Sequence, residues 1–345
     1  MAGPDQASWF ERLAAEHNNL ATALAWSLER REAETALRLG AALWPYWYAH
    51  GHVTEGRRWL EEALRLPGGA GASAIRARAL VGAGRLASTQ ADYARAARCY
   101  DEGLALARAC GDTGATAAAL AWKGKLVARE ASQEAAAAVL FAESLALARE
   151  ADDKAGMARV LQWMGRLEEG LSLARELGDT IGVASLLCDL GDQARCVGDD
   201  TTAARRYDES LALFRELHHQ QGIASALHNL GHLALHGRNP GLANERFQGS
   251  LAIFREIGHT WSAGDCLVGL AGVAVARGDA VHAAHLLGAA QTLQQPLGGH
   301  RSEANQVEYE SIVRAVQAQL DTAAFAVTLA EGQRITPDQA VDAKG

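Results

Sequence analysis

The stretch "TIGVASLLCDLGDQARCVGDDTTAARRYDESLALFRELHH" fills residues 180–219, and two further blocks of 40 residues follow it without a gap. These blocks are "QQGIASALHNLGHLALHGRNPGLANERFQGSLAIFREIGH" (220–259) and "TWSAGDCLVGLAGVAVARGDAVHAAHLLGAAQTLQQPLGG" (260–299). Two earlier blocks, 72–112 and 113–153, follow the same plan with one extra residue each. A repeat of fixed length predicts units that stack in register, because each unit buries its apolar face only against its neighbours.

Each block contains two apolar patterns with helical spacing. The apolar positions of the block 220–259 are Leu227, Leu230, Gly231 and Ala234, followed by Ala243, Phe247, Ser250, Leu251 and Phe254. Residues spaced by three and four lie on one face of a helix. Asn239 and Pro240 are typical of a helix start, and Gly178, Gly258 and Gly298 are placed to end the second helices. The sequence therefore predicts an all-α protein built from helix pairs.

Small and aromatic residues alternate in a way that predicts how the helices of a pair meet. Gly191 and Gly231 are expected where the first helix comes closest to its partner, and the matching small positions on the second helices are Ala203, Ala243 and Ala283. The gap between repeats is expected to be filled by Tyr207, Phe247 and Leu287. This order resembles the tetratricopeptide repeat, in the longer version used by large bacterial regulators. The resemblance implies a right-handed α-solenoid over residues 33–299, with an N-terminal helical cap at 1–32 and a C-terminal helical cap at 300–345.

One block is shorter than the others. Residues 154–179 number 26, so 14 residues are missing around the expected turn between the helices. Fourteen residues are close to four helical turns at ~3.6 residues per turn, so the apolar phase almost survives the deletion. We expect one continuous helix here. The alternative is a truncated hairpin with a tight turn near Gly165 or Gly170.

Segments at both ends extend the resemblance. They are "WFERLAAEHNNLATALAWSLER" (9–30), "LWPYWYAHGHVTEGRRWLEEAL" (43–64) and "YESIVRAVQAQLDTAAFAVTLAEGQRITPDQAV" (309–341). With the repeats, they resemble the MalT-like sensor region of LuxR-type and related STAND-class ATP-binding transcriptional regulators. The resemblance implies a sensor and scaffold that binds an inducer or another protein and signals to an NTPase module. The chain has no GxxxxGK loop followed by Ser or Thr and no segment typical of a DNA-reading helix-turn-helix, so it resembles the sensor half alone.

A polar stripe is predicted on the inner face of the repeats. His228, His232 and His236 are spaced by four, and Cys188 and Asp192 stand 40 positions before the first two. Adjacent first helices of a solenoid run side by side, so these side chains are expected to face one groove that binds a protein or peptide. The predicted groove consists of Arg85, Lys125, Arg129, Asp189, Asp192, Arg195, His228, Asn229, His232 and His236.

Two alternatives to a peptide groove are open. A small-molecule inducer could occupy a pocket near the aromatic segment or near the discontinuity at residues 165–200. A zinc site could instead draw on imidazoles and thiolates, and its candidate ligands are Cys188, Asp192, Cys196, His228, His232 and His236. Side chains from two helices would have to converge on one ion, so we expect no metal and no other cofactor. No credible catalytic arrangement is found, and we expect a binding protein rather than an enzyme.

Aromatic residues cluster near the N-terminus. The group consists of Trp44, Tyr46, Trp47, Tyr48 and Trp59. Aromatic side chains at helical spacing favour packing in the core, and a ligand cage is the alternative. His218, His219 and His259 stand at repeat junctions, where we expect surface positions without a role.

Composition restricts the remaining functions. The net charge of −8 argues against direct binding of nucleic acid, which needs clustered Lys and Arg. The longest uncharged run around the aromatic segment, Leu39 to Thr54, has 16 residues, fewer than the ~20 that cross a bilayer, so we expect no membrane partner. Five cysteines without a secretory signal predict free thiols and a cytoplasmic location.

Overall fold

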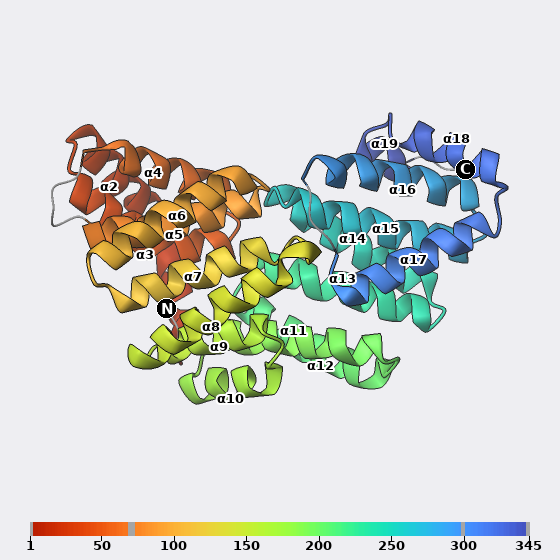
Figure 1. The fold of residues 1–345 in the computed structure, drawn as a ribbon. Coiled ribbons are helices and arrows are strands. Elements are labelled where there is room, and N and C mark those ends of the chain that lie inside the picture. The colour runs from red at the N-terminus through yellow and green to blue at the C-terminus, as the bar shows by residue number, and fades with distance from the viewer. Residues whose placement is uncertain (1–2, 68–72, 298–300, 343–345) are drawn as a thin grey trace. The chain divides into compact units, whose positions relative to one another are not determined.

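The structure, a computed structural model, describes residues 3–67, 73–297 and 301–342, and its regular elements in these ranges are helices (Figure 1). The fold is therefore all-α and built from stacked helix pairs, as the sequence predicts. The chain divides into two compact units, which are described separately below. Unit 1 holds residues 1–186 and 216–219, and unit 2 holds residues 187–215 and 220–345.

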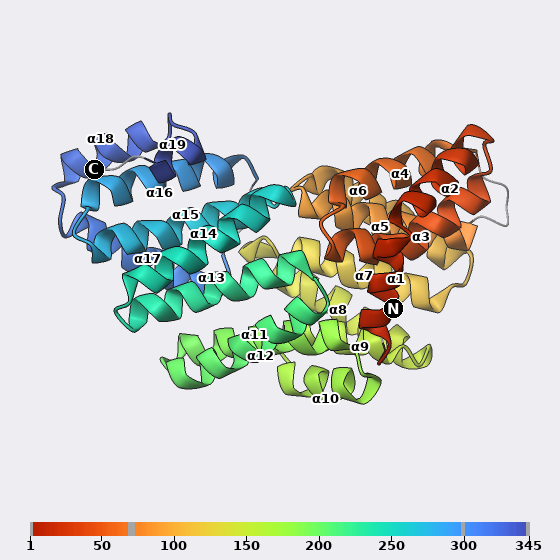
Figure 2. The ribbon, with the colours of Figure 1, turned by 180° about the vertical axis from the view of Figure 1, so that it is seen from behind.

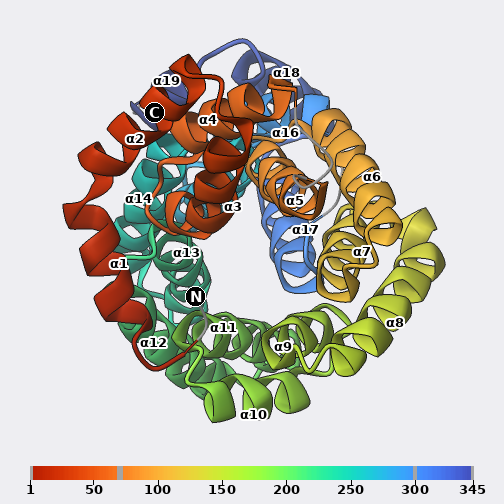
Figure 3. The ribbon, with the colours of Figure 1, turned by 90° about the vertical axis from the view of Figure 1, so that its left-hand side faces the viewer.

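Unit 1 contains the N-terminal helices and the first repeats. Its helices are α1 (Gln6–Ala15), α2 (His17–Glu29), α3 (Ala33–Ala49), α4 (Val53–Arg65), α5 (Ser73–Thr89), α6 (Tyr93–Ala109), α7 (Thr113–Val127), α8 (Glu134–Glu150), α9 (Lys154–Trp163) and α10 (Leu167–Leu177), with a 3₁₀ turn at Ala131–Gln133 and the first part of α11 (Thr180–Cys196). Within this unit, α3, α5, α7 and α9 lie on one side of α4, α6, α8 and α10 (Figure 3). The first helices of the pairs therefore form one layer and the second helices another.

The helices of a pair approach each other at a glycine. A Cβ atom added to Gly84 would lie 2.5 Å from the ring of Tyr100, and one added to Gly124 would lie 2.7 Å from the ring of Phe141. Such distances are too short for carbon atoms, so only glycine lets the aromatic ring of the second helix close against the first. The close approach at the glycine is as the repeat pattern predicts, but the residue that meets the glycine is the aromatic one expected between repeats.

The shortened block at residues 154–179 is a hairpin, so the predicted continuous helix is wrong and the alternative is correct. Helix α9 ends at Trp163, and α10 begins at Leu167. Gly165 between them has a positive φ of 75°, a conformation that glycine adopts without strain. The turn is tight because the deletion removed the end of one helix and the start of the next.

The N-terminal helix α1 also belongs to this unit (Figure 2). Its residue Gln6 donates a hydrogen bond from Nε2 to Oδ1 of Asp179 at 3.1 Å and accepts one from the backbone N–H of Ile181 at 2.9 Å. Helix α1 is thereby fixed at the start of α11.

Unit 2 contains the later repeats and the C-terminal helices. Its helices are the rest of α11, α12 (Asp200–Glu216), α13 (Gln220–His236), α14 (Pro240–Glu256), α15 (Thr260–Ala276), α16 (Ala280–Gln294), α17 (Glu303–Gln317), α18 (Thr322–Gly332) and α19 (Pro337–Asp342), with a 3₁₀ turn at Gln295–Leu297. Gly258 has a positive φ of 72° after α14, as Gly178 has a φ of 64° after α10, and Gly298 lies outside the described residues. Both described glycines therefore end their helices as predicted.

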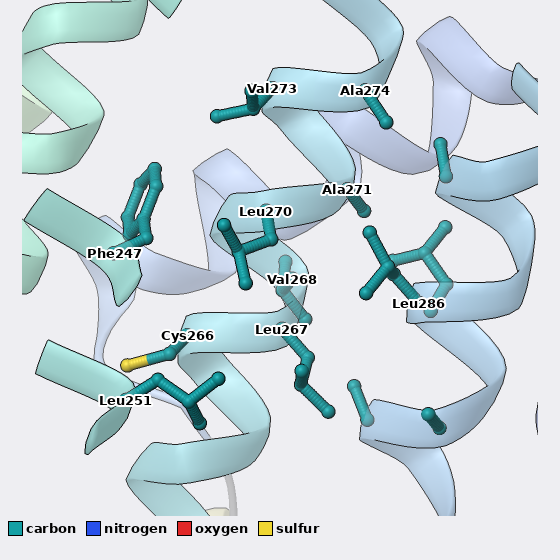
Figure 4. Close-up of a cluster of buried hydrophobic side chains, with 14 of the residues drawn as sticks. Phe247, Leu251, Cys266, Leu267, Val268, Leu270, Ala271, Val273, Ala274 and Leu286 are labelled. Atoms are coloured by element: carbon teal, nitrogen blue, oxygen red, sulfur yellow. The ribbon is translucent and has the colours of Figure 1, made fainter. Parts of the chain in front are cut away.

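The core of unit 2 lies between its helix pairs (Figure 4). A Cβ atom on Gly231 would lie 2.7 Å from the buried ring of Phe247, which repeats the glycine–aromatic contact of unit 1. A still closer approach joins α16 to α18, because a Cβ atom on Gly288 would lie 2.2 Å from the backbone oxygen of Leu329. The C-terminal helices therefore pack directly on the last repeat.

Candidate functional site

A cavity of about 360 Å³ lies in unit 1, on the face formed by the first helices of the pairs. Its lining includes Trp44, Pro45 and Tyr48 of α3, Arg85 of α5, Trp122 and Lys125 of α7, Ala155, Ala158, Arg159, Gln162 and Trp163 of α9, Asp179, Ile181, Gly182, Ser185 and Leu186 at and in α11, and His219. Pockets for small molecules measure ~300–1,000 Å³. The cavity is therefore large enough for a metabolite.

One wall of the cavity is aromatic. The rings of Trp122 and Trp163 meet edge to face with their centroids 4.7 Å apart, and Trp44 meets Trp122 in the same manner at 6.2 Å. Tyr48 adds a ring that meets the imidazole of His219 at 5.6 Å. Ring faces of this kind stack on planar ligands.

Three cationic side chains line the same cavity. The guanidinium of Arg85 lies 4.1 Å from the centroid of Tyr48 and 4.8 Å from that of Trp122. Arg159 lies 5.7 Å from Trp122, and the ammonium of Lys125 lies 5.7 Å from Trp163. Cations held against ring faces are attracted by the negative face of the ring. The arrangement orders positive charge beside an aromatic surface.

The guanidinium groups of Arg85 and Arg159 are only partly satisfied by hydrogen bonds. The Nε atoms of Arg85 and Arg159 are buried and have no hydrogen-bond partner among the described residues. Burial lowers the pKa of Arg159, although Asp153 and Asp179 act in the opposite direction. Asp179 is itself occupied by Gln6 and by the backbone N–H of Gly182 at 3.2 Å. The cavity therefore favours a ligand that carries negative charge.

His219 is buried, which corrects the prediction that it is a surface residue without a role. Burial is the main cause that lowers its pKa to about 4, and His50 and Arg85 lower it further. The imidazole is neutral at physiological pH as a result, so it contributes a polar but uncharged part of the lining.

The aromatic group predicted near the N-terminus is divided between the core and the lining of the cavity. Tyr46 and Trp47 are buried in the core, as packing predicts. Trp44 and Tyr48 instead line the cavity. Trp59 is partly buried and packs against the same core.

A second, smaller cavity of about 180 Å³ lies in unit 2 and is polar. Five residues singled out from the sequence line it, namely Cys188, Asp189, Asp192, His228 and Asn229, together with Ser225, Phe254, Ser262, Asp265 and Asn305. Asn229 donates hydrogen bonds from Nδ2 to Asp192 at 2.9 Å and to the Cys188 sulfur at 3.6 Å. The register of 40 residues therefore brings the side chains of α11 and α13 together as predicted.

Helix α17 covers the rest of this polar face. Arg195 is buried, with its guanidinium 2.8 Å from Oδ1 of Asn305 and 3.4 Å from a carboxylate oxygen of Glu308. His232 is also buried, and burial lowers its pKa well below the usual value. His236 is exposed and lies 3.0 Å from Glu308. Arg195, His232 and His236 therefore lie against α17 of the same chain.

The remaining predicted groove residues lie in unit 1. Arg85 and Lys125 line the 360 Å³ cavity. Arg129 lies outside that lining, with its guanidinium 3.7 Å from the ring centroid of Tyr93. Two of these three cationic side chains, Arg85 and Lys125, therefore line the cavity.

The six candidate zinc ligands do not form a compact donor set. Among the described residues, the three-membered group of His, Cys or carboxylate ligands whose atoms lie within 4.8 Å of one another consists of His17, His52 and Glu55. Cys188 and His228 are buried, and Cys196 is exposed. Burial also raises the pKa of the Cys188 thiol and lowers that of His228. Hydrogen bonds of Asn229 connect Cys188 and Asp192 of this cluster.

Among the tryptophan, tyrosine and cationic residues of the unit 1 cavity, sequence reasoning missed Trp122, Arg159 and Trp163. Trp122 and Trp163 stand 41 positions apart, which is the length of the block that contains Trp122. A repeated tryptophan on the first helix was thus a signal that both rings lie on one face. Arg159 gave no such signal, because the equivalent residue 41 positions earlier is Ala118.

Comparison with known proteins gives a regulatory context. No protein-family model matches the chain. Proteins named "Putative HTH-type transcriptional regulator" from Mycobacterium tuberculosis and Mycobacterium bovis are 34% identical to it over 116 residues. The match covers 32% of this chain and 13% of each relative. The chain is therefore similar to part of these regulators.

Helices suited to crossing a membrane are not found in the described ranges, where each helix is too short or too polar.

Proposed function

We propose that this chain is the ligand-sensing part of a transcription regulator, and that its unit 1 cavity binds a small anion that carries a planar ring. One observation carries the proposal. Four aromatic and three cationic side chains surround a single cavity of about 360 Å³. A ring would stack on Trp122 or Trp163, and an anionic group would pair with Arg85, Lys125 or Arg159.

The source of the lining residues suggests how binding would be transmitted. They come from α3, α5, α7, α9 and α11, which are successive first helices of the pairs. A ligand that touches all five helices restrains their positions relative to one another. Because each repeat packs only against its neighbours, a change at one repeat moves the next, and the repeats shift together. The ligand would thus change the shape of the unit that a signalling partner recognises.

The context of the chain supports regulation rather than catalysis. The repeat register resembles the tetratricopeptide sensor region of STAND-class regulators, and the relatives are named as transcriptional regulators. The net charge of −8 supports sensing rather than direct contact with DNA. We assign the chain binding without chemical conversion of the ligand.

A thermal-shift screen followed by calorimetry tests this function. Untagged protein is screened against three matched sets of compounds: anions with a planar ring, uncharged molecules with the same ring, and aliphatic anions. A ligand that binds only the folded state raises the melting temperature. We expect stabilisation by members of the first set and none by the other two.

Variants of the cavity locate the binding. Trp122→Ala and Lys125→Met should each weaken binding by about fivefold or more, since each removes an interaction of ~1 kcal/mol or more. Trp26→Ala is the matched control, because Trp26 also stacks with an arginine, Arg30 at 4.8 Å, but is exposed on α2. Equal binding by wild type and Trp122→Ala would contradict the assignment.

A protein partner, the function first predicted from the sequence, is a second candidate through the polar cavity of unit 2. Three carboxylates line that cavity, those of Asp189, Asp192 and Asp265, together with the buried Nε2 of His228, which has no hydrogen-bond partner among the described residues. Its 180 Å³ suits one cationic side chain of a partner. Peptides with a single exposed arginine should then bind, and Asp189→Asn should weaken them. Equal affinity for the Arg→Gln peptide would exclude this use of the cavity.

A further inference from the structure

A compact group of three metal-ligating side chains lies in unit 1, outside the cavity described above. His17 is the first residue of α2, His52 immediately precedes α4, and Glu55 lies in the first turn of α4. Nε2 of His17 is 3.3 Å from Oε2 of Glu55. The rings of His17 and His52 stack with their centroids 4.2 Å apart and their planes 20° apart. One ligand atom of each residue lies within 4.8 Å of those of the other two.

The surroundings hold this group in place and leave it accessible. Trp59 donates a hydrogen bond from Nε1 to Oε1 of Glu55 at 3.4 Å, so that the other carboxylate oxygen faces His17. The ring of the buried Tyr46 lies 5.6 Å from His52 and closes the inner side. The three side chains are partly buried, and their outer side is open to solvent.

The imidazole of His52 contacts the rings of His17 and Tyr46. His52 occupies the N-cap of α4 but makes no side-chain capping hydrogen bond there, so its ring nitrogens are not engaged by the start of the helix.

We propose that His17, His52 and Glu55 bind a divalent transition-metal ion, with zinc as the best match. Two imidazoles and one carboxylate are a known zinc donor set that leaves the fourth position to water or another ligand. Zinc requires ligand distances of ~2.0–2.2 Å, so the two imidazoles must rotate out of their stacked arrangement when the ion binds. Because the ligands come from α2 and α4, the ion joins these two helices and stabilises the N-terminal end of unit 1.

Calorimetry with zinc chloride tests the site directly. The full-length, untagged chain is first treated with a chelator and then titrated with zinc. We expect one zinc ion per chain with a defined heat, and a melting temperature that rises with zinc concentration. In cobalt-substituted protein, the visible bands of four-coordinate cobalt should appear at the same stoichiometry.

Substitutions distinguish zinc binding at this site from zinc binding to histidines elsewhere on the chain. His52→Ala and Glu55→Gln should each weaken zinc binding by about tenfold or more, an effect typical of losing a ligand. Circular dichroism and the melting temperature without metal report whether each variant folds. The control is His285→Ala, because His285 also faces a glutamate, Glu331 at 3.3 Å, in unit 2.

The opposite results would overturn the proposal. These are the absence of stoichiometric binding by the wild type, or folded His52→Ala and Glu55→Gln variants that bind zinc as the wild type does. A loss of the same size in His285→Ala would also overturn it, since the zinc would then bind exposed histidines in general.

Discussion

The imidazole Nε2 of His236, at the end of α13, lies 3.0 Å from Oε1 of Glu308 in α17. Its other ring nitrogen lies 3.0 Å from Oδ1 of Asp200. The hydrogen bond to Glu308 is the main cause that raises the pKa of His236 to about 9, and the bond to Asp200 adds to it, against the effect of burial. A protonated histidine therefore fixes α17 to the repeats of unit 2.

This pair predicts a pH-dependent part of the stability. The pKa of His236 in the folded protein lies above the unfolded value of about 6.5. The contribution is therefore present in full below about pH 6.5 and is lost as the pH rises through about 9. Because His236 is exposed and solvent screens the pair, we expect His236→Ala to lower the free energy of unfolding by about 1 kcal/mol at acidic pH and by little at about pH 9.5. Urea unfolding at both pH values measures the difference, and an equal loss at both would contradict the role of the charge.

Alanine substitutions at Gly231, which contacts Phe247, and at Gly249, which does not, should have opposite effects on the free energy of unfolding. Gly231→Ala places a methyl group 2.7 Å from a fully buried ring, so the free energy of unfolding should fall by about 1–3 kcal/mol. Gly249→Ala should raise it by up to about 1 kcal/mol, because the added Cβ lies 3.7 Å from the side chain of Leu227, an ordinary contact, and alanine favours a helix. Denaturant unfolding of both variants gives the comparison. Stabilisation by Gly231→Ala would show that the two helices are not in close contact.

The turn at Gly165 predicts that the α9–α10 hairpin tolerates asparagine better than alanine. Gly165 has a φ of 75°, which costs an alanine about 1–2 kcal/mol and an asparagine less. Gly165→Ala should therefore lower the free energy of unfolding, and Gly165→Asn should stay closer to the wild type. A continuous helix predicts the reverse order, because alanine is the better helix former.

The five cysteines are free thiols, as the sequence predicts, and they differ in accessibility. Cys110 and Cys196 are exposed, whereas Cys99, Cys188 and Cys266 are buried. Burial also raises the pKa of each of the three buried thiols, which lowers their fraction of reactive thiolate. Ellman's reagent should therefore react with two thiols in the folded protein and with five after denaturation. Rapid reaction of a third thiol in the folded protein would contradict the packing around the buried cysteines.

The sequence predicts the helix pairs well, because their signals are local and repeat. Gly231 and Phe247 lie within one block, and equivalent pairs recur at fixed spacing. The shortened block shows where this reasoning fails. A deletion of 14 residues almost preserves the helical phase, so periodicity is compatible with both a helix and a hairpin. The positive φ of Gly165 favours a turn at this position and therefore the hairpin. The spacing of apolar residues carries no information about this backbone preference.

The candidate site is predicted less completely, because it depends on contacts between distant segments. Arg85 and Lys125 were found from the repeat register, and both line the unit 1 cavity. The covering of Arg195 and His232 by α17 could not be predicted, since Glu308 lies outside the repeats and has no register with them. The sequence predicts a surface position for His219 at a repeat junction, whereas the side chain is buried beside Tyr48.

A crystal structure of the full chain with the most stabilising anion from the screen tests the central claim most directly. We expect electron density for a planar ring stacked against Trp122 or Trp163, with its anionic group within hydrogen-bond distance of Arg85, Lys125 or Arg159. Density for that compound at another place, with the unit 1 cavity holding only solvent, would contradict the assignment of this cavity as the sensor site.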